Sequence, residues 1–231
     1  MICINCKHEH SFDYCPKCGE KAQVPKITFV SIFKDGFSTI TNMDKGLLFN
    51  IKHIAIRPKQ IVNDYLQGKR KSILNPVSFL IISITIYLIV NSLGDTKSID
   101  SNRGSEAYSI GVHARNFILS YFKYFWILSV IWMSVATKIF FRRYNFAEHL
   151  TINSFVIGQA TLVGLISYLV YPSSLFLTPW VYLAIAWLIY EIFKAKRLDL
   201  PVLFKSLGTI ILFFLQIMLI GVLIGSIINR T

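Results

Sequence analysis

Long stretches without a charged residue constrain the fold of this 231-residue chain more than any other feature. No Asp, Glu, Lys or Arg occurs in residues 72–94, 149–190 or 206–229. The segment 117–141 contains only two lysines, near its ends. Because about 20 apolar residues in a helix cross a bilayer, the 42 residues of 149–190 are enough for two crossings. These stretches predict five transmembrane helices, at residues 76–93, 117–141, 150–171, 175–193 and 206–229.

The cysteines of the chain form a second, separate signal. All four lie in the first 18 residues as two CxxC pairs, Cys3 with Cys6 and Cys15 with Cys18, and eight residues separate the pairs. Two such turns together present four thiolates, and a tetrahedral sulfur site suits Zn²⁺ best. Gly19 follows the second pair, where a side chain would crowd the turn. The spacing therefore predicts a zinc ribbon, with a closed site that is structural and not catalytic.

Other uses of the four cysteines are less well supported. An iron ion takes the same ligands, and the sequence does not separate it from zinc. A thioredoxin-like CxxC motif requires a βαβ context, which the sequence lacks. His8 and His10 lie between the pairs, and we expect them to face solvent because four thiolates already complete a structural site.

The basic residues predict an orientation in the membrane. Residues 1–75 contain twelve Lys and Arg against six Asp and Glu, and the loops after the second and fourth predicted spans add seven more basic residues. The opposite side has only five. Basic loops stay in the cytoplasm, so the N-terminus and the ribbon are expected there and the C-terminus outside. A reducing cytoplasm favours zinc over disulfides.

Residues 23–75, between ribbon and membrane, are expected to form short amphipathic helices. Apolar residues recur every three or four positions over 27–40 and 47–54, and Pro58 opens a third helix that Gly68 ends. Such helices lie in the bilayer interface or pack on the cytoplasmic ends of the spans, and the sequence favours neither. The basic run that follows is a candidate for lipid-headgroup contact, although its main expected role is to set the topology: Lys69, Arg70 and Lys71.

Polar residues near and inside the third predicted span are candidate sites of chemistry. Glu148 and His149, at its cytoplasmic mouth, are candidates to bind a proton, a metal or a headgroup. The competing interpretation is that Glu148 only complements the positive end of the helix dipole. Asn153 and Gln159 are expected to hydrogen-bond between helices. No catalytic motif is present, so no catalytic residue is predicted and the chain is not expected to be an enzyme.

The order of these segments resembles an uncharacterised bacterial family of multi-pass membrane proteins with an N-terminal zinc ribbon, classed as a domain of unknown function. The resemblance rests on the four-cysteine ribbon, "KITFVSIFKDGFSTITNMDKGLLFNIKHIAIRP", "YLQGKRKSILNP" and the first span, within residues 3–90. It is weaker at "YNFAEHLTINSF", residues 144–155. The resemblance implies an all-α membrane protein of the bacterial inner membrane, and it implies no activity.

Together these observations predict three parts: a zinc ribbon at 1–22, amphipathic helices at 23–75 and a five-helix transmembrane domain at 76–231. The function expected from this order is a membrane-anchored adaptor or scaffold, whose ribbon binds a cytoplasmic protein. The alternatives are a small transporter or channel, or an enzyme acting on lipid. Nucleic acid is not an expected partner because the ribbon is nearly neutral. A GxxxG motif at Gly221 and Gly225 suits packing inside the bundle or a homo-oligomer.

Overall fold

Helices make up the body of the protein in a computed structural model that describes residues 1–21, 28, 46–70, 73–93, 122–171, 175 and 178–228. Within these residues there are seven helices, and the only β-pairing is two isolated bridges near the N-terminus. The predicted all-helical class is therefore confirmed. The helices are α2 (Gly46–Ile56), α3 (Pro58–Leu66), α4 (Pro76–Ser92), α6 (Phe122–Phe140), α7 (Phe146–Val170), α8 (Pro179–Phe193) and α9 (Leu200–Ile228).

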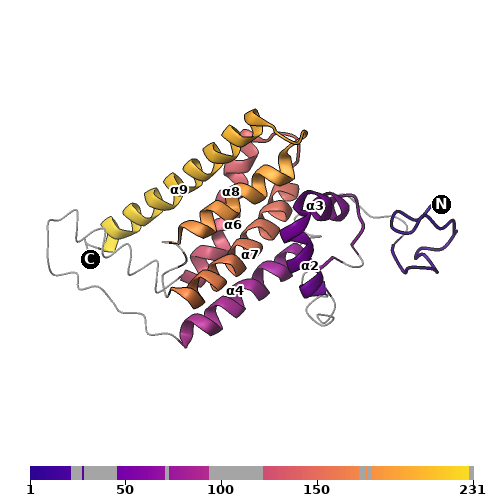
Figure 1. Ribbon diagram of the computed structural model, residues 1–231, viewed down its shortest axis with the longest axis horizontal. Helices are drawn as coiled ribbons and strands as arrows, with labels where there is room; N and C mark the ends of the chain where they lie inside the picture. The colour runs from indigo at the N-terminus through magenta and orange to yellow at the C-terminus, as the bar shows by residue number, and fades with distance from the viewer. Residues whose placement is uncertain are drawn as a thin grey trace.

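Helix α7 is the centre of the bundle. It packs against α4, α6 and α8, and α9 lies along the outer edge on α6 and α8 (Figure 1). Of the 18 consecutive residues that form the most apolar part of α7, 72% are buried, whereas in α9 the buried share is 17%. Helices α2 and α3 pack across one end of the bundle, against each other, α7 and α8.

Local sequence signals place the helix ends. The Asn75 side chain accepts hydrogen bonds from the amides of Val77 (3.0 Å) and Ser78 (3.4 Å), while Pro76 occupies the first helical position of α4. Pro58 and Pro179 likewise begin α3 and α8. Each proline has a fixed φ that suits the first turn and lacks an N–H that would have no partner there.

Helix α3 ends at the predicted glycine. Gly68 adopts a φ of 97°, and its amide donates to the Tyr65 carbonyl at 3.1 Å. The amide of Lys69 donates to the Asp64 carbonyl at 2.9 Å, which completes a Schellman motif. The apolar face of α3, which includes Val62, is buried in the bundle core. Of the two arrangements expected for this helix, packing is observed, against α7 and α8. A position in the bilayer interface stays a prediction.

Helices α4 and α7 approach each other closely at Gly158. A Cβ built on Gly158 would lie 2.8 Å from Cδ1 of Phe79 and 3.3 Å from the Cα of Leu80. Phe79 is fully buried and packs on Phe155, with ring centroids 6.1 Å apart. The small residue at 158 therefore serves contact inside the chain, as expected for small residues in packed helices.

Polar side chains join α6 to α7 inside the bundle. Asn153 donates to the hydroxyls of Ser134 (3.1 Å) and Thr137 (2.8 Å), and the indole of Trp126 donates to Thr161 at 2.7 Å. All five side chains are buried. The predicted role of Asn153 as an interhelical hydrogen-bonding residue is thus observed.

The predicted spans at 76–93 and 175–193 are shorter than expected. By length and composition, the described residues include two helices that can cross a membrane, Phe146–Val170 and Leu200–Ile220, against the five predicted. Helix α4 has 17 residues and α8 has 15; the latter is about 22 Å long at 1.5 Å per residue, against a hydrocarbon core of about 30 Å. In 149–190 the uncharged length misplaced both helix starts: α7 begins earlier than predicted, at Phe146, and α8 begins later, at Pro179.

Some predicted features lie outside the described residues. These are the amphipathic stripe over 27–40 apart from residue 28, the first residues of the span predicted at 117–141, and the side chain of Lys71.

We predict that Gly158→Val destabilises the bundle by about 1–3 kcal/mol, because neither the buried Phe79 ring nor the α4 backbone has room to move. Thermal unfolding of the detergent-solubilised protein measures this. Thr85→Val, on the exposed face of α4, is the control and should change the midpoint little. Equal midpoints for both variants would mean that α4 and α7 are not in close contact.

Candidate functional site

The cysteine segment is built from the same turn used twice, 12 residues apart. In the first copy the Cys3 amide donates to the His8 carbonyl (2.9 Å) and the Lys7 amide to the Cys3 carbonyl (3.1 Å). The second copy repeats both bonds, from Cys15 to Glu20 at 2.8 Å and from Gly19 to Cys15 at 2.6 Å. An antiparallel bridge closes each copy: Ile2 with Glu9, and Tyr14 with Lys21.

The residue after each CxxC pair has a positive φ. Gly19 has a φ of 68°, which glycine adopts without strain. Lys7 occupies the equivalent position with a φ of 61°, in the left-handed region that costs a residue with a Cβ about 1–2 kcal/mol. The strain at Lys7 persists because the backbone bonds of the turn hold it in this conformation.

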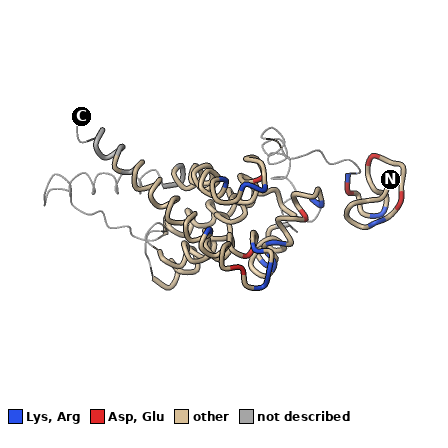
Figure 2. The backbone as a smooth tube through the Cα atoms, turned by 90° about the horizontal axis from the view of Figure 1, so that it is seen from above, with Lys and Arg blue, Asp and Glu red and all other residues tan. Residues whose placement is uncertain are grey.

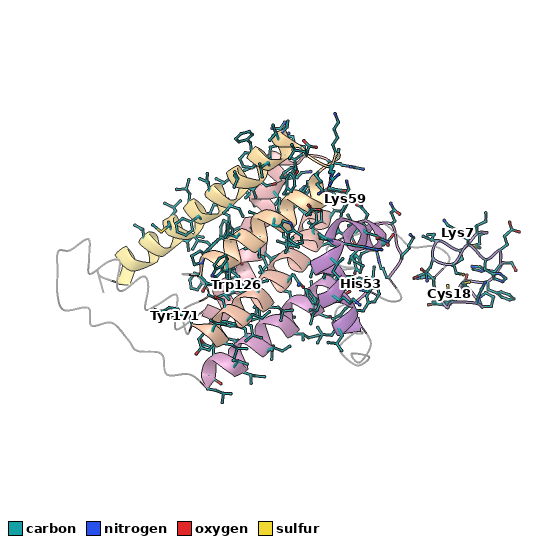
Figure 3. All side chains as sticks on the ribbon, in the orientation of Figure 1. Lys7, Cys18, His53, Lys59, Trp126 and Tyr171 are labelled. Atoms are coloured by element: carbon teal, nitrogen blue, oxygen red, sulfur yellow. The ribbon has the colours of Figure 1, made fainter. Side chains whose placement is uncertain are left out.

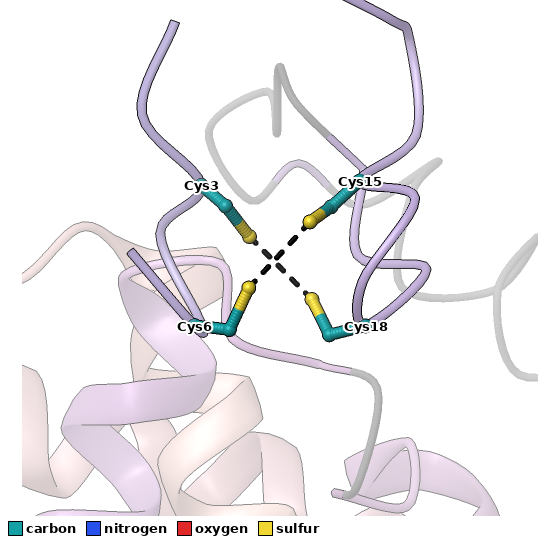
Figure 4. Close-up of side chains that lie close together, drawn as sticks. All are labelled: Cys3, Cys6, Cys15 and Cys18. Carbon is teal, nitrogen blue, oxygen red and sulfur yellow. Dashed lines mark hydrogen bonds between the residues drawn. The ribbon is translucent and has the colours of Figure 1, made fainter. Parts of the chain in front are cut away.

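The two turns bring all four sulfurs together. Figure 4 shows the cysteine side chains converging on one point, with Sγ–Sγ distances of 3.5 Å for Cys3–Cys18 and for Cys6–Cys15. The four ligand atoms lie within 4.8 Å of one another. A metal bound tetrahedrally by thiolates at about 2.3 Å needs sulfurs about 3.8 Å apart, so the arrangement fits a metal ion.

Before any metal binds, the surroundings of the sulfurs favour the thiolate form of one cysteine, Cys3. The backbone N–H of Cys6 lowers the pKa of Cys3 to about 6, against the opposing effect of desolvation. For Cys6, the His8 N–H lowers the pKa, but desolvation and the sulfurs of the other cysteines outweigh it and raise the pKa to about 12. A bound cation favours the thiolate form of all four, and four protein ligands leave no open position for a substrate.

The two histidines between the pairs are outside this cluster. His8 is exposed, as expected, whereas His10 is half-buried. The group of potential metal ligands at this place consists of the four cysteines.

Glu148 and His149 are adjacent in sequence but serve different structural roles. Glu148 and Asn145 form a capping box: the Asn145 amide donates to Glu148 Oε2 at 2.7 Å, and the Glu148 amide donates to Asn145 Oδ1 at 2.8 Å. His149 is fully buried, with Nε2 2.8 Å from the Phe141 carbonyl and its ring near that of Phe193. The structure therefore does not bring the two side chains together around a common ligand.

The basic run after α3 is also held by local contacts. The Lys69 ammonium pairs with Asp64 at 2.7 Å, in the turn that ends α3. The Arg70 guanidinium lies over the Tyr65 ring, 5.1 Å from its centroid. Both residues are half-buried.

Charged residues gather at one end of the bundle, where α2 and α3 lie (Figure 2). This end includes the start of α4, the α6–α7 turn and the α8–α9 turn. The side chain of Lys123, near the start of α6, is outside the described part of the structure. The basic residues of this end are Lys52, Arg57, Lys59, Lys69, Arg70, Lys138, Arg142, Arg143, Lys194, Lys196, Arg197 and Lys205, and the acidic ones are Asp64, Glu148, Glu191 and Asp199.

Comparison with known proteins identifies a family over part of the chain. Residues 44–88 match the family described as "Protein of unknown function (DUF3667)". The match covers α2, α3 and most of α4, and it confirms the resemblance to an uncharacterised family. Neither the search of curated proteins nor the search of solved structures found a match.

Two features of these sites were not predicted although the sequence contains their signals. Cys3 to Cys15 and Cys6 to Cys18 are both steps of 12, which indicates a repeated turn and a second residue like Gly19, namely Lys7. The N-x-x-E pattern of Asn145 and Glu148 is a capping-box signature.

We predict one tightly bound metal ion per chain, measured by elemental mass spectrometry of the purified protein. Cys15→Ser removes one of four thiolates and should lower the occupancy to well below half after dialysis against a mild chelator. His8→Ala should retain full occupancy. Equal loss in both variants would contradict a four-cysteine site.

We also predict that Lys7→Gly strengthens the metal-bound turn by about 1 kcal/mol, because glycine relieves the left-handed strain. The apparent affinity, measured by competition with a chromogenic chelator, should rise about fivefold. Lys17→Gly, within the second CxxC turn but without a positive φ, should not improve it. A Lys7→Gly affinity at or below that of the natural chain would show that residue 7 is unstrained.

Proposed function

We propose that this protein is a membrane-anchored adaptor of the bacterial inner membrane, with a structural zinc ribbon that binds a protein in the cytoplasm. The five-helix bundle holds the ribbon at the membrane. The proposal combines three separate arguments: the polarity of the bundle, the orientation of its charges and the closed form of the metal site.

The polarity of the bundle is the observation that carries the membrane assignment. Its outward faces are apolar, while its interior contains the hydrogen bonds of Asn153 and Trp126. Soluble monomers rarely expose apolar patches larger than a few hundred Å². If α7 were only the core helix of a soluble protein, the apolar side chains exposed on the helices around it would have no explanation. Large apolar side chains exposed on α4, α6, α8 and α9 include Ile81, Ile89, Ile127, Leu128, Trp132, Trp180, Leu183, Ile211, Leu215 and Leu219.

The short helices are compatible with insertion. A helix shorter than the hydrocarbon core is accommodated by local thinning of the bilayer and by aromatic or basic residues at its ends. Tyr171 and Trp180 are exposed at the end of the bundle opposite the charges, and such aromatic side chains favour the membrane–water interface. The basic end faces the cytoplasm in this proposal, in line with the preference of Lys and Arg for that side.

Zinc is the metal we propose. Four thiolates in two CxxC turns form a closed site of the kind that zinc occupies in small structural modules. A segment this short buries little apolar area, so the metal supplies most of its folding free energy. When bound, zinc crosslinks the two turns and adds no reactive position.

Binding to a partner suits this design better than transport or catalysis does. The transporter alternative requires a hydrated path that reaches Gln159, and this side chain is buried in the packed centre of the bundle. The lipid-enzyme alternative requires Glu148 and His149 to act together, and their side chains have separate structural partners. The ribbon, by contrast, exposes large side chains at Ile2, Phe12 and Tyr14 that are available to a protein partner.

Comparative affinity purification from native membranes tests the adaptor proposal. We expect proteins that co-purify with the natural chain to be lost with Cys15→Ser, because the ribbon no longer folds, while both chains stay in the membrane fraction. Thr85→Val should retain the same proteins as the natural chain. Identical co-purifying proteins for the natural chain and Cys15→Ser would contradict the proposal.

A further inference from the structure

An open groove lies at the charged end of the bundle, between the α2–α3 turn and the end of α8. Its volume is about 440 Å³. Figure 3 labels Lys59 at this end and Tyr171 at the opposite one. The side chains that line the groove and matter for its chemistry are Ile56, Arg57, Lys59, Gln60, Asn63 and Glu191.

Two cationic side chains, two residues apart in the chain, line this groove. Arg57 is exposed in the turn that joins α2 to α3. The Lys59 ammonium donates to the Lys194 carbonyl at the end of α8, and this bond uses one of its three donors. Lys59 is therefore held at the groove by α8, with donors remaining for a ligand.

The single acidic side chain of the groove is neutralised by its own partner. Glu191 accepts a hydrogen bond from the Lys194 ammonium, in an ion pair along the end of α8. Gln60 and Asn63 add amide groups one turn apart on α3. The groove thus presents cations and amide N–H donors, the groups that bind a phosphate oxygen.

One large apolar side chain adjoins these polar groups. Ile56, the last residue of α2, lines the groove and is 62% exposed. Leu48, on the same helix, is 74% exposed. A ligand that matches the groove therefore has an anionic phosphate next to a hydrocarbon chain.

We propose that this groove binds the headgroup of an anionic phospholipid, with Arg57 and Lys59 on the phosphate and the acyl chain beside Ile56. This inference rests on the membrane insertion proposed above. It places the lipid contact away from Lys69 and Arg70, whose charges are engaged by Asp64 and by the Tyr65 ring.

Native mass spectrometry of the detergent-solubilised protein with added phosphatidylglycerol tests the proposal. The double variant Arg57→Gln/Lys59→Gln should weaken phosphatidylglycerol binding about tenfold or more, because each cation near an anionic lipid contributes appreciably. The double variant Lys196→Gln/Arg197→Gln is a matched control. It also removes one Lys and one Arg from exposed positions at the same end of the bundle, but outside the groove, and should change binding less than twofold.

Three further outcomes decide the matter. Equal weakening by both double variants would show that attraction to the whole basic end, not the groove, binds the lipid, and would overturn the proposal. Equal binding of phosphatidylcholine would overturn it as well. Inorganic phosphate that displaces the lipid at micromolar concentration would assign the groove to free phosphate instead.

Folding and membrane insertion are monitored separately. Arg57→Gln alone changes an exposed side chain, so it serves if the double variant unfolds, and it should weaken binding at least threefold. Carbonate extraction reports whether the chain is integral to the membrane. A chain that resists extraction but does not prefer phosphatidylglycerol would overturn the groove proposal and leave the adaptor proposal intact.

Discussion

Among the described residues of the helical bundle, charge gathers at one end, and the rest of the structure depends on this asymmetry. It leaves the sides of α4, α6, α8 and α9 apolar. In the proposed membrane, backbone groups there must be satisfied within each helix. It also leaves the contacts between helices to close packing and to a few buried hydrogen bonds. Gly158 permits the close packing of α7 on α4, and Asn153 makes the buried hydrogen bonds from α7 to α6. At the charged end, capping residues and ion pairs stabilise the helix ends and turns.

The cysteine segment depends on a different interaction. Its two turns are held by backbone hydrogen bonds that recur 12 residues apart, and the four sulfurs meet where a metal ion fits. Two copies of one turn place the ligands symmetrically with few residues, which suits a segment with almost no hydrophobic core. The strained φ of Lys7 indicates that turn geometry is maintained even where the residue type is unfavourable.

The sequence predicted those features that depend on local pattern. Short-range chemistry explains three of them: the meeting of the four cysteines, the role of Gly68 at the end of α3 and the start of α4 at Pro76. The lengths of the helices could not be predicted in this way, because the absence of charge does not specify that α8 begins at Pro179. The surroundings of His149 were beyond prediction, because its burial near Phe193 depends on how separate segments fold together. The groove likewise requires α3 and α8 to meet. The ion pair of Lys69 with Asp64 is local, and it was not predicted either.

Cysteine labelling in oriented vesicles tests the central claim, that the bundle crosses the membrane with its charged end in the cytoplasm. In a chain whose four natural cysteines are replaced by serine, single cysteines are placed by Arg197→Cys at the charged end and by Tyr171→Cys at the other. A membrane-impermeant maleimide should label position 197 only in inside-out vesicles and position 171 only in right-side-out vesicles. Labelling of both positions from the same side would contradict the account.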